Sequence, residues 1–424
     1  MRLGYNLDSE PLCENQTLHT QSNFRLLIVR LGAMGDILHA LPAVTALRLA
    51  HPDWQIGWVV EPRWQPLLRA GTKGTREQGN KETNEERLAI SGNRSAEADI
   101  RGPEMPVRGS AMPIVDRLHF APSREWKRHP LSSSTLRAIA ALSRELRAAN
   151  YSAVLDLQGA IRSAVIARMS GCPRRIGEAA PREWPAQWLF TERVVTHGAH
   201  VIEQDLELAS AVAGDTLAAS LENASGLAKT SGSSNHSPLL PAPLLPIDPE
   251  ADAWCASWLA DTFAGAARPI ALITPGAGWG AKRWPPERYA AVAEGLGERG
   301  LHVVVNAGPG EEPLAAAIAS GRAVSLTATL PQLIALTRRI ALCIGGDTGP
   351  LHLASALGRP VVGIYGPTDP SRNGPYGTRA RVLRSPDSRR DHSRRDAPDP
   401  GLLTIAPDDV LRAADELLAE ESAR

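Results

Sequence analysis

One apolar run in the second half of the sequence ends in side chains suited to a phosphorylated sugar. Ile340–Ile344 leads into two glycines, and Asp347 follows at the expected N-cap of a helix, just before Thr348 and Gly349. Backbone N–H groups at a helix start bind anions, with the positive end of the helix dipole behind them. A carboxylate accepts hydrogen bonds from hydroxyl groups. The stretch therefore predicts a site for a phosphate joined to a polyol.

Two neighbouring loops supply further candidates for the same ligand. Lys282 lies in a glycine-rich loop after the apolar run 270–274, and Glu311 follows the run 301–306. Lysine binds phosphate as a point charge, and a carboxylate at a strand end holds ribose hydroxyls. His352 lies one helical turn beyond Thr348, and we expect it to pack beside this donor site rather than to act as a catalyst. Together the loops indicate a nucleoside diphosphate carrying a polyol.

Several common nucleotide motifs are missing from the sequence. It contains no GxxxxGKS/T loop, and the GAMG of the first half lacks the full GxGxxG pattern, which disfavours an ATPase or a standard dinucleotide enzyme. It also contains no DxD pair for a metal-bound pyrophosphate. We therefore expect no metal and no cofactor, and we expect Lys282 and the helix terminus to stabilise charge on a leaving diphosphate.

Asp36 is the main candidate of the first half. It follows the apolar run Arg25–Arg30 and a glycine turn, at the strand end where doubly wound sheets bind ligands. Two roles are open: a helix cap, or a general base that takes the proton from an acceptor hydroxyl. Pro42 predicts that the following helix begins near Leu41 or is kinked there.

A basic cluster offers a place for an anionic, partly apolar acceptor. It consists of Arg124, Lys127 and Arg128, with Trp126 among them. A solvated helix start explains the same pattern equally well. Asp156 and Gln158, at the end of another expected strand, are weaker acceptor-site candidates.

The order of apolar runs predicts two α/β domains with mostly parallel sheets. We expect a disordered tail at 1–23 and an acceptor-binding domain at 24–215 with a low-complexity insertion at 71–112. A linker at 216–248 and a nucleotide-sugar domain at 249–424, ending in a helix, follow.

The composition restricts the kinds of binding partner and the cellular location that we expect. Lys plus Arg and Asp plus Glu both number 46, so no global charge favours nucleic acid. Cys172, Cys255 and Cys343 lie in or beside apolar runs and are expected to be buried, reduced thiols. Neither a signal peptide nor an apolar stretch of about 20 residues is evident. We expect a cytoplasmic protein that is at most peripheral to a membrane.

These residues resemble family 9 glycosyltransferases, the lipopolysaccharide heptosyltransferases, and most of all the heptosyltransferase I group. The matching stretches are RLLIVRLGAMGDILHALPAVTAL (25–47), WVVEPRW (58–64), YSAVLDLQGAIRSAVIARMSG (151–171), KRWP (282–285), AGPGEE (307–312) and GGDTGPLHLASALGRPVVGIYGPTDP (345–370). The resemblance implies a GT-B fold, with two Rossmann-like domains around a cleft. It also implies metal-independent, inverting transfer of L-glycero-D-manno-heptose from ADP-heptose to the Kdo of lipid A, at the inner face of the cytoplasmic membrane.

The resemblance assigns roles to individual residues. It implies that Asp36 is the catalytic base and that Lys282, with the N–H groups near Thr348 and Gly349, holds the donor diphosphate. Asp347 is implied to hold the heptose hydroxyls and Glu311 to lie near the ribose. The region of Arg124 to Arg128 is implied to receive the acidic acceptor.

Departures from the family pattern keep alternatives open. The insertion, the long linker and the segment 385–400 have no family counterpart, and the donor loop reads PGAGWGAKRW where hydroxyl residues often occur. The alternatives are a heptosyltransferase II-type enzyme, a family 9 transferase with another acceptor or nucleotide sugar, a sugar-nucleotide epimerase, and a non-catalytic nucleotide-sugar binder.

Overall fold

The structure is a computed structural model, and it describes residues 24–70, 113–214, 217, 242–263, 267–319, 321–390 and 395–422. The expected tail at 1–23, the insertion at 71–112 and most of the linker at 216–248 lie outside the described residues.

The first half contains a six-stranded, wholly parallel sheet in the order β3-β2-β1-β4-β5-β6. Its strands are β1 (Arg25–Val29), β2 (Gln55–Val60), β3 (Arg117–Phe120), β4 (Ala153–Asp156), β5 (Arg175–Glu178) and β6 (Glu192–Val194). The connecting helices are α1 (Met34–Ala50), η1 (Pro62–Leu67), α2 (Ser123–Arg128), α3 (Ser133–Ala148), α4 (Ile161–Met169), η2 (Trp184–Leu189) and α5 (Val201–Ala213).

The second half repeats this plan with the order β12-β11-β10-β7-β8-β9. Its strands are β7 (Ile270–Thr274), β8 (His302–Ala307), β9 (Ala323–Thr327), β10 (Leu342–Gly346), β11 (Val361–Tyr365) and β12 (Ala380–Arg384). Its helices are α7 (Pro249–Thr262), η3 (Gly280–Lys282), α8 (Pro286–Glu298), α9 (Glu312–Ile318), α10 (Leu330–Thr337), α11 (Gly349–Ala356), α12 (Pro370–Asn373), η4 (Leu402–Thr404) and α13 (Pro407–Ser422).

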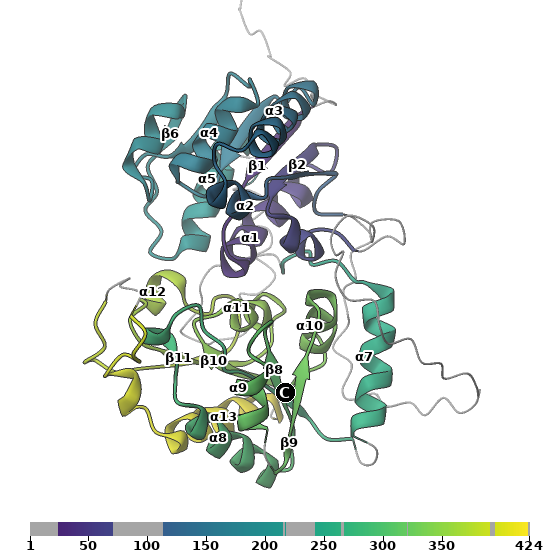
Figure 1. The fold of residues 1–424 in the computed structure, drawn as a ribbon, viewed down its shortest axis with the longest axis vertical. Coiled ribbons are helices and arrows are strands. Elements are labelled where there is room, and N and C mark those ends of the chain that lie inside the picture. Colours follow the sequence, from purple (N-terminus) through teal and green to yellow (C-terminus); the bar gives the residue numbers. More distant parts are fainter. Residues whose placement is uncertain are drawn as a thin grey trace, which may run out of the picture.

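Both sheets are doubly wound, as the sequence predicted. The strand order reverses between β1 and β4 in one half and between β7 and β10 in the other, and ligands bind outside the carboxyl ends of strands at such points. The two halves lie one above the other, with α1 facing α11 across the boundary (Figure 1). The loops that carry Asp36, Lys282 and Asp347 all leave these reversal points.

Burial explains the apolar runs. Leu26 to Val29 of β1 and Leu342 to Ile344 of β10 have no exposed surface, as expected for parallel strands covered on both faces. Cys172, Cys255 and Cys343 are free and buried, which confirms the expectation for these three thiols. Cys13 lies outside the described residues.

Of the two alternatives stated for Pro42, a helix start near Leu41 was wrong, and so was the N-cap expected at Asp347. Helix α1 is continuous from Met34 to Ala50 with Pro42 inside it, so it does not begin near Leu41. Almost every side chain from Met34 to Arg48 is buried, and this packing outweighs the lost backbone hydrogen bond at Pro42. In α11 the N-cap is Thr348 rather than Asp347, and the Asp347 side chain bonds to the side chains of Lys282 and His352 instead of to the first N–H groups of the helix.

None of the helices within the described ranges is long and apolar enough to cross a membrane. Over the same ranges, no group of three or more His, Cys, Asp or Glu side chains is arranged to hold a metal ion.

Candidate active site

The loop that carries Asp36 is tied to the neighbouring strand end. The Gln158 side-chain oxygen accepts hydrogen bonds from the N–H groups of Leu31 (2.9 Å) and Gly32 (3.0 Å). Asp156 accepts from the N–H of Gln158 at 2.8 Å and so fixes that loop in turn. Gln158 thus shapes the loop before Asp36 with its side-chain oxygen, and acceptor binding by this side chain stays a prediction.

Asp36 is held at both carboxylate oxygens. Oδ2 accepts from the N–H of Ala33 at 2.8 Å, and Oδ1 lies 3.8 Å from the Arg30 guanidinium. A Cβ on Gly32 would lie 1.9 Å from Oδ2, so this turn leaves no room for a side chain at Gly32. The Asp36 side chain is 34% exposed. The carboxylate therefore combines a capping contact with access to a ligand.

Behind Asp36 lies a buried charge cluster that the sequence did not reveal. Arg30 is also 4.0 Å from Asp205 on α5, and both side chains are nearly inaccessible. Burial raises the pKa of Asp205 to about 7, although the charge of Arg30 acts in the opposite direction. Burial likewise raises the pKa of Asp156 to about 6. The only sequence signal was a charged residue on the apolar face of α5, between Ile202 and Leu206.

The basic cluster lies on α2, where Arg124, Lys127 and Arg128 are all exposed. Buried Glu61, at the end of β2, anchors this helix by accepting from the Ser123 hydroxyl (2.5 Å) and from the Arg124 N–H (3.2 Å). The orientation of α2 is therefore set from the end of β2, the strand next to β1 in the sheet.

Arg63 and Trp64 lie between the basic cluster and the loop before Asp36, and neither was singled out as a candidate from the sequence. The Trp64 indole donates to the carbonyl of Gly32 at 2.8 Å, and the Arg63 guanidinium lies 4.2 Å above the Trp64 ring. Partial burial, followed by repulsion from Arg124, lowers the pKa of Arg63. Arg63 thus shares an electrostatic environment with Arg124. The available signal was the stretch WVVEPRW, which ends at Trp64.

On the opposite half, Asp347 is the centre of a nearly dry polar group. One carboxylate oxygen forms an ion pair with Lys282, and the other lies 2.9 Å from Nε2 of His352. Burial alone would raise the pKa of Asp347, but the hydrogen bond from His352 and the charges of His352 and Lys282 hold it well below its usual range. The Lys282 ammonium also lies 4.2 Å above the Trp279 ring.

The remaining donor candidates frame this group. The Thr348 hydroxyl donates to the carbonyl of Gly346 at 3.3 Å and does not cap α11, so no N-cap side chain covers the first N–H groups of that helix. Glu311 accepts from the N–H of Gly308 at 3.0 Å. A Cβ on Gly276 would lie 2.2 Å from the Glu311 carboxylate, so Glu311 lies between the loops that follow β7 and β8.

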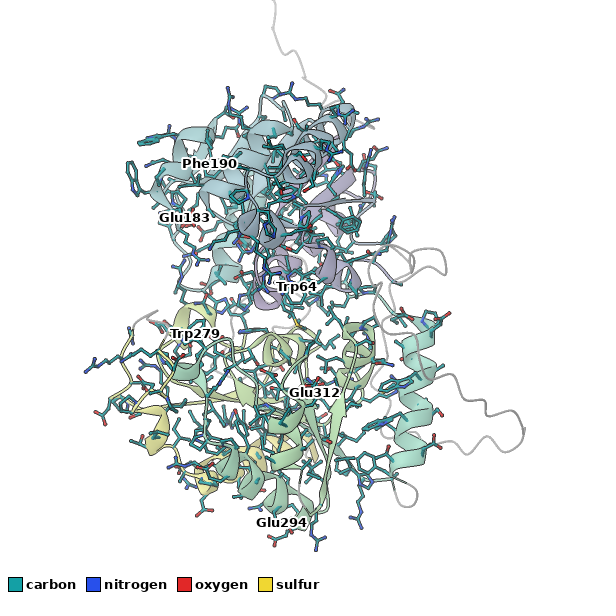
Figure 2. The ribbon with its side chains drawn as sticks, in the orientation of Figure 1. Trp64, Glu183, Phe190, Trp279, Glu294 and Glu312 are labelled. Atoms are coloured by element: carbon teal, nitrogen blue, oxygen red, sulfur yellow. The ribbon has the colours of Figure 1, made fainter. Side chains whose placement is uncertain are left out.

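The start of α1 touches the start of α11. A Cβ on Gly349 would lie 2.7 Å from the Met34 sulfur, and a Cβ on Gly35 would lie 2.9 Å from the His352 ring. The residues just before Asp36 thereby touch the helix that carries His352 and follows Asp347. Trp64 and Trp279 mark the facing edges of the two halves (Figure 2). The arrangement suits a carboxylate base working on a ligand held from the other side.

Comparison with known proteins identifies this arrangement. The model of glycosyltransferase family 9 (heptosyltransferase) matches residues 139–400. The chain belongs to glycosyltransferase family 9. As a member of that family it is an enzyme that transfers a sugar.

Curated family 9 relatives include proteins with two activities. Lipopolysaccharide heptosyltransferase 1 of Escherichia coli K12 is 26% identical over 370 residues, which cover 85% of this chain and 94% of that protein. Lipopolysaccharide heptosyltransferase 2 of the same strain is 33% identical over 169 residues, which cover 37% of this chain and 49% of that protein.

Solved family 9 structures share the fold. The E. coli heptosyltransferase WaaC with ADP-2-deoxy-2-fluoro heptose superimposes with a TM-score of 0.62 at 22% identity, covering 93% of this chain and 99% of that one. The family 9 glycosyl transferase of Veillonella parvula gives 0.67 at 20% identity, with coverages of 94% and 98%. These superpositions confirm the GT-B fold expected from the sequence.

Proposed function

We propose that this enzyme transfers L-glycero-D-manno-heptose from ADP-heptose to the Kdo residue of lipid A in lipopolysaccharide core assembly. The observation that carries the proposal is the junction of α1 and α11, where Gly35, the residue before Asp36, packs against His352, and His352 in turn bonds to Asp347. Asp36 removes the proton from the acceptor hydroxyl, which attacks the anomeric carbon from the face opposite ADP. The configuration at that carbon inverts.

The donor half supports this assignment by its charge. A diphosphate at the start of α11 meets the backbone N–H groups near Thr348 and Gly349, and the ammonium of Lys282 is within the same group. As the bond to the sugar breaks, negative charge develops on the diphosphate, where Lys282 and the helix terminus stabilise it. Asp347 then binds the heptose hydroxyls, and Glu311 binds the ribose.

The acceptor half offers a basic surface for an acidic sugar on a lipid. Arg124, Lys127 and Arg128 are exposed on α2, and Arg63 lies between them and the Asp36 loop. Kdo carries a carboxylate, and arginine binds carboxylates through two parallel hydrogen bonds. The same surface would let a cytoplasmic enzyme dock electrostatically on the inner face of an anionic membrane.

A second acceptor has its own support. The local identity of 33% to a heptosyltransferase 2 exceeds the 26% found over the longer match to a heptosyltransferase 1. On that reading the acceptor hydroxyl belongs to a heptose already attached to Kdo, while donor and base stay the same.

The deciding experiment measures ADP release from ADP-heptose with Kdo-lipid A, with heptosyl-Kdo-lipid A, and without acceptor. We expect release only with Kdo-lipid A, and loss of nearly all of it in Asp36→Asn, whose amide oxygen can still accept from Ala33. Calorimetry should show unchanged donor binding in that variant. Release with the heptosylated acceptor alone would select the second candidate. Release without any acceptor, or wild-type turnover in Asp36→Asn, would refute the proposal.

A further inference from the structure

Three buried histidines meet where the two halves touch, and the transfer mechanism above uses none of them as a catalyst. His39 lies on α1, His200 precedes α5, and His352 lies on α11. His39 is the central one: its ring centre lies 4.5 Å from that of His352 and 5.5 Å from that of His200. All three side chains are at least 93% buried.

We propose that His39 is a positioning residue that completes a hydrogen-bonded chain across the cleft, from α1 through His352 to Asp347. The chain latches the two halves together and orients the Asp347 carboxylate toward the donor. The proposal rests on the function proposed above, because it assigns to Asp347 a role in donor binding.

The distances define a continuous chain. Nε2 of His39 lies 3.2 Å from Nδ1 of His352, and Nε2 of His352 lies 2.9 Å from Oδ1 of Asp347. The second oxygen of Asp347 pairs with Lys282. The chain thus runs from His39, through His352 and Asp347, to Lys282, the lysine that we expect to hold the diphosphate.

The chemistry of the chain fixes where the protons lie. A carboxylate only accepts, so Nε2 of His352 carries the hydrogen. In neutral His352, Nδ1 is then an acceptor, and His39 must donate its own Nε2–H to it. Burial is the main cause that holds the pKa of His39 well below its usual value; the charge of Arg30 acts in the same direction, and Asp347 acts the other way. His39 is therefore a neutral donor with one defined tautomer.

The surroundings show why the latch belongs to the closed arrangement. His200 also reaches across the boundary, with Nε2 3.1 Å from the carbonyl of Gly374, and the Tyr376 hydroxyl donates to Glu203 at 2.9 Å. Burial lowers the pKa of His200 to about 4. Separating the halves would break these contacts and would expose imidazoles that then titrate near their ordinary pKa.

The position of His39 on its helix couples the latch to the base. Asp36 and His39 are three residues apart on α1, so they lie on neighbouring turns of one face. When the His39 hydrogen bond forms, the start of α1 is held at a fixed distance from the donor site. Closure, donor orientation and placement of Asp36 are thereby one event.

The test compares two replacements of His39 with a matched control. His39→Gln retains an N–H donor for His352, whereas His39→Phe retains a flat ring and removes the donor. His197→Gln is the control, since His197 lies on the same half with its side chain 82% exposed. Each protein is assayed for ADP-heptose binding by calorimetry, for kcat and KM across pH 5 to 9, and for the His352 tautomer by ¹⁵N NMR of histidine-labelled protein.

We expect His39→Phe to weaken ADP-heptose binding and to lower kcat, each by on the order of tenfold, the effect of removing one buried hydrogen-bond partner. His352 should lose its single Nε2–H tautomer. His39→Gln should recover most of each property, and His197→Gln should match wild type.

Three outcomes separate the possibilities. If His39→Phe kept the ADP-heptose affinity, the kcat and the His352 NMR spectrum of the wild type, the proposed role of His39 would be wrong. Equal losses in both His39 variants with an unchanged His352 spectrum would assign His39 to packing alone and would also overturn it. Failure of the wild type to transfer heptose would refute the proposed function, while donor binding and the NMR spectrum would still test the chain.

Discussion

Gly349 of α11 and Met34 of α1 meet so closely that a Cβ at Gly349 would lie 2.7 Å from both the Cβ and the sulfur of Met34. The two residues come from different halves of the molecule, on the helix starts that carry the proposed donor site and the proposed base. The contact therefore sets how near Asp36 can come to a bound donor.

Gly349→Ala is expected to hold the two helix starts apart. The overlap includes the Cβ of Met34, whose position is fixed by the backbone. A change of the Met34 rotamer therefore cannot relieve it. We expect kcat to fall by about a hundredfold, because small displacements of reacting groups cost about that much. Steady-state kinetics would measure this. Gly278→Ala is the control, because a Cβ there meets nothing within 4 Å, and equal losses in both variants would contradict the steric explanation.

Lys282→Met is expected to destabilise the second half by roughly 3 kcal/mol, because it leaves Asp347 buried with one partner fewer. Urea unfolding would measure the loss. Lys282→Met combined with Asp347→Asn should recover part of it, since the second change removes the unpaired charge. Both variants should bind ADP-heptose poorly. A double variant less stable than Lys282→Met would show that the charge pair is not the source of the effect.

Arg63→Ala is expected to raise the KM for the lipid acceptor severalfold and to leave ADP-heptose binding unchanged. The reason is that Arg63 lies over Trp64, on the acceptor side of the Asp36 loop. The effect should shrink at high salt, where exposed charges are screened. Arg137→Ala provides the comparison, since Arg137 is exposed on α3 and, among the described residues, its side chain bonds to Ser133 of the same helix. If Arg63→Ala changed the affinity for ADP-heptose, Arg63 would belong to the donor site and the assignment to the acceptor site would be wrong.

Asp205→Asn is expected to change the pH dependence of stability. The folded pKa of about 7 exceeds the ordinary value of 3.8, so the fold holds a proton that the unfolded chain releases. Stability is then complete below about pH 4 and falls as the pH rises toward 7. In Asp205→Asn the free energy of unfolding should not decrease in this way. The difference between variant and wild type should therefore shift in favour of the variant by on the order of 2 kcal/mol between pH 5 and pH 8. Urea midpoints at the two pH values would measure it, and parallel curves would contradict the assignment.

The sequence was a good guide wherever one element carried the signal. Apolar runs ending in glycine correctly indicated the strand ends of β1, β7, β8 and β10, and parallel sheets place such ends along one edge. Asp36, Lys282 and Asp347 follow from that rule, because each lies in or just after the connection that leaves a strand at a point where the strand order reverses.

The sequence could not show which residues that are far apart along the chain contact each other in the fold. The pair of Lys282 with Asp347 depends on β7 and β10 being neighbours in the sheet, which periodicity does not show. The contact of His39 with His352 depends on how two separate sheets face each other. The expected helix start near Leu41 was wrong because it rested on the local preference of Pro42 alone. The tertiary packing of buried side chains, which the sequence does not show, keeps α1 continuous.

The repeated strand order of the two sheets has an evolutionary consequence. Each half is a complete doubly wound unit with its own ligand edge, so acceptor preference and donor preference can diversify in separate segments of the gene. What restricts exchange of halves between relatives is the seam where they meet: a recombinant must inherit the surroundings of Met34 and His39 together with those of Gly349 and His352. Coevolution within the family should therefore be concentrated at that seam.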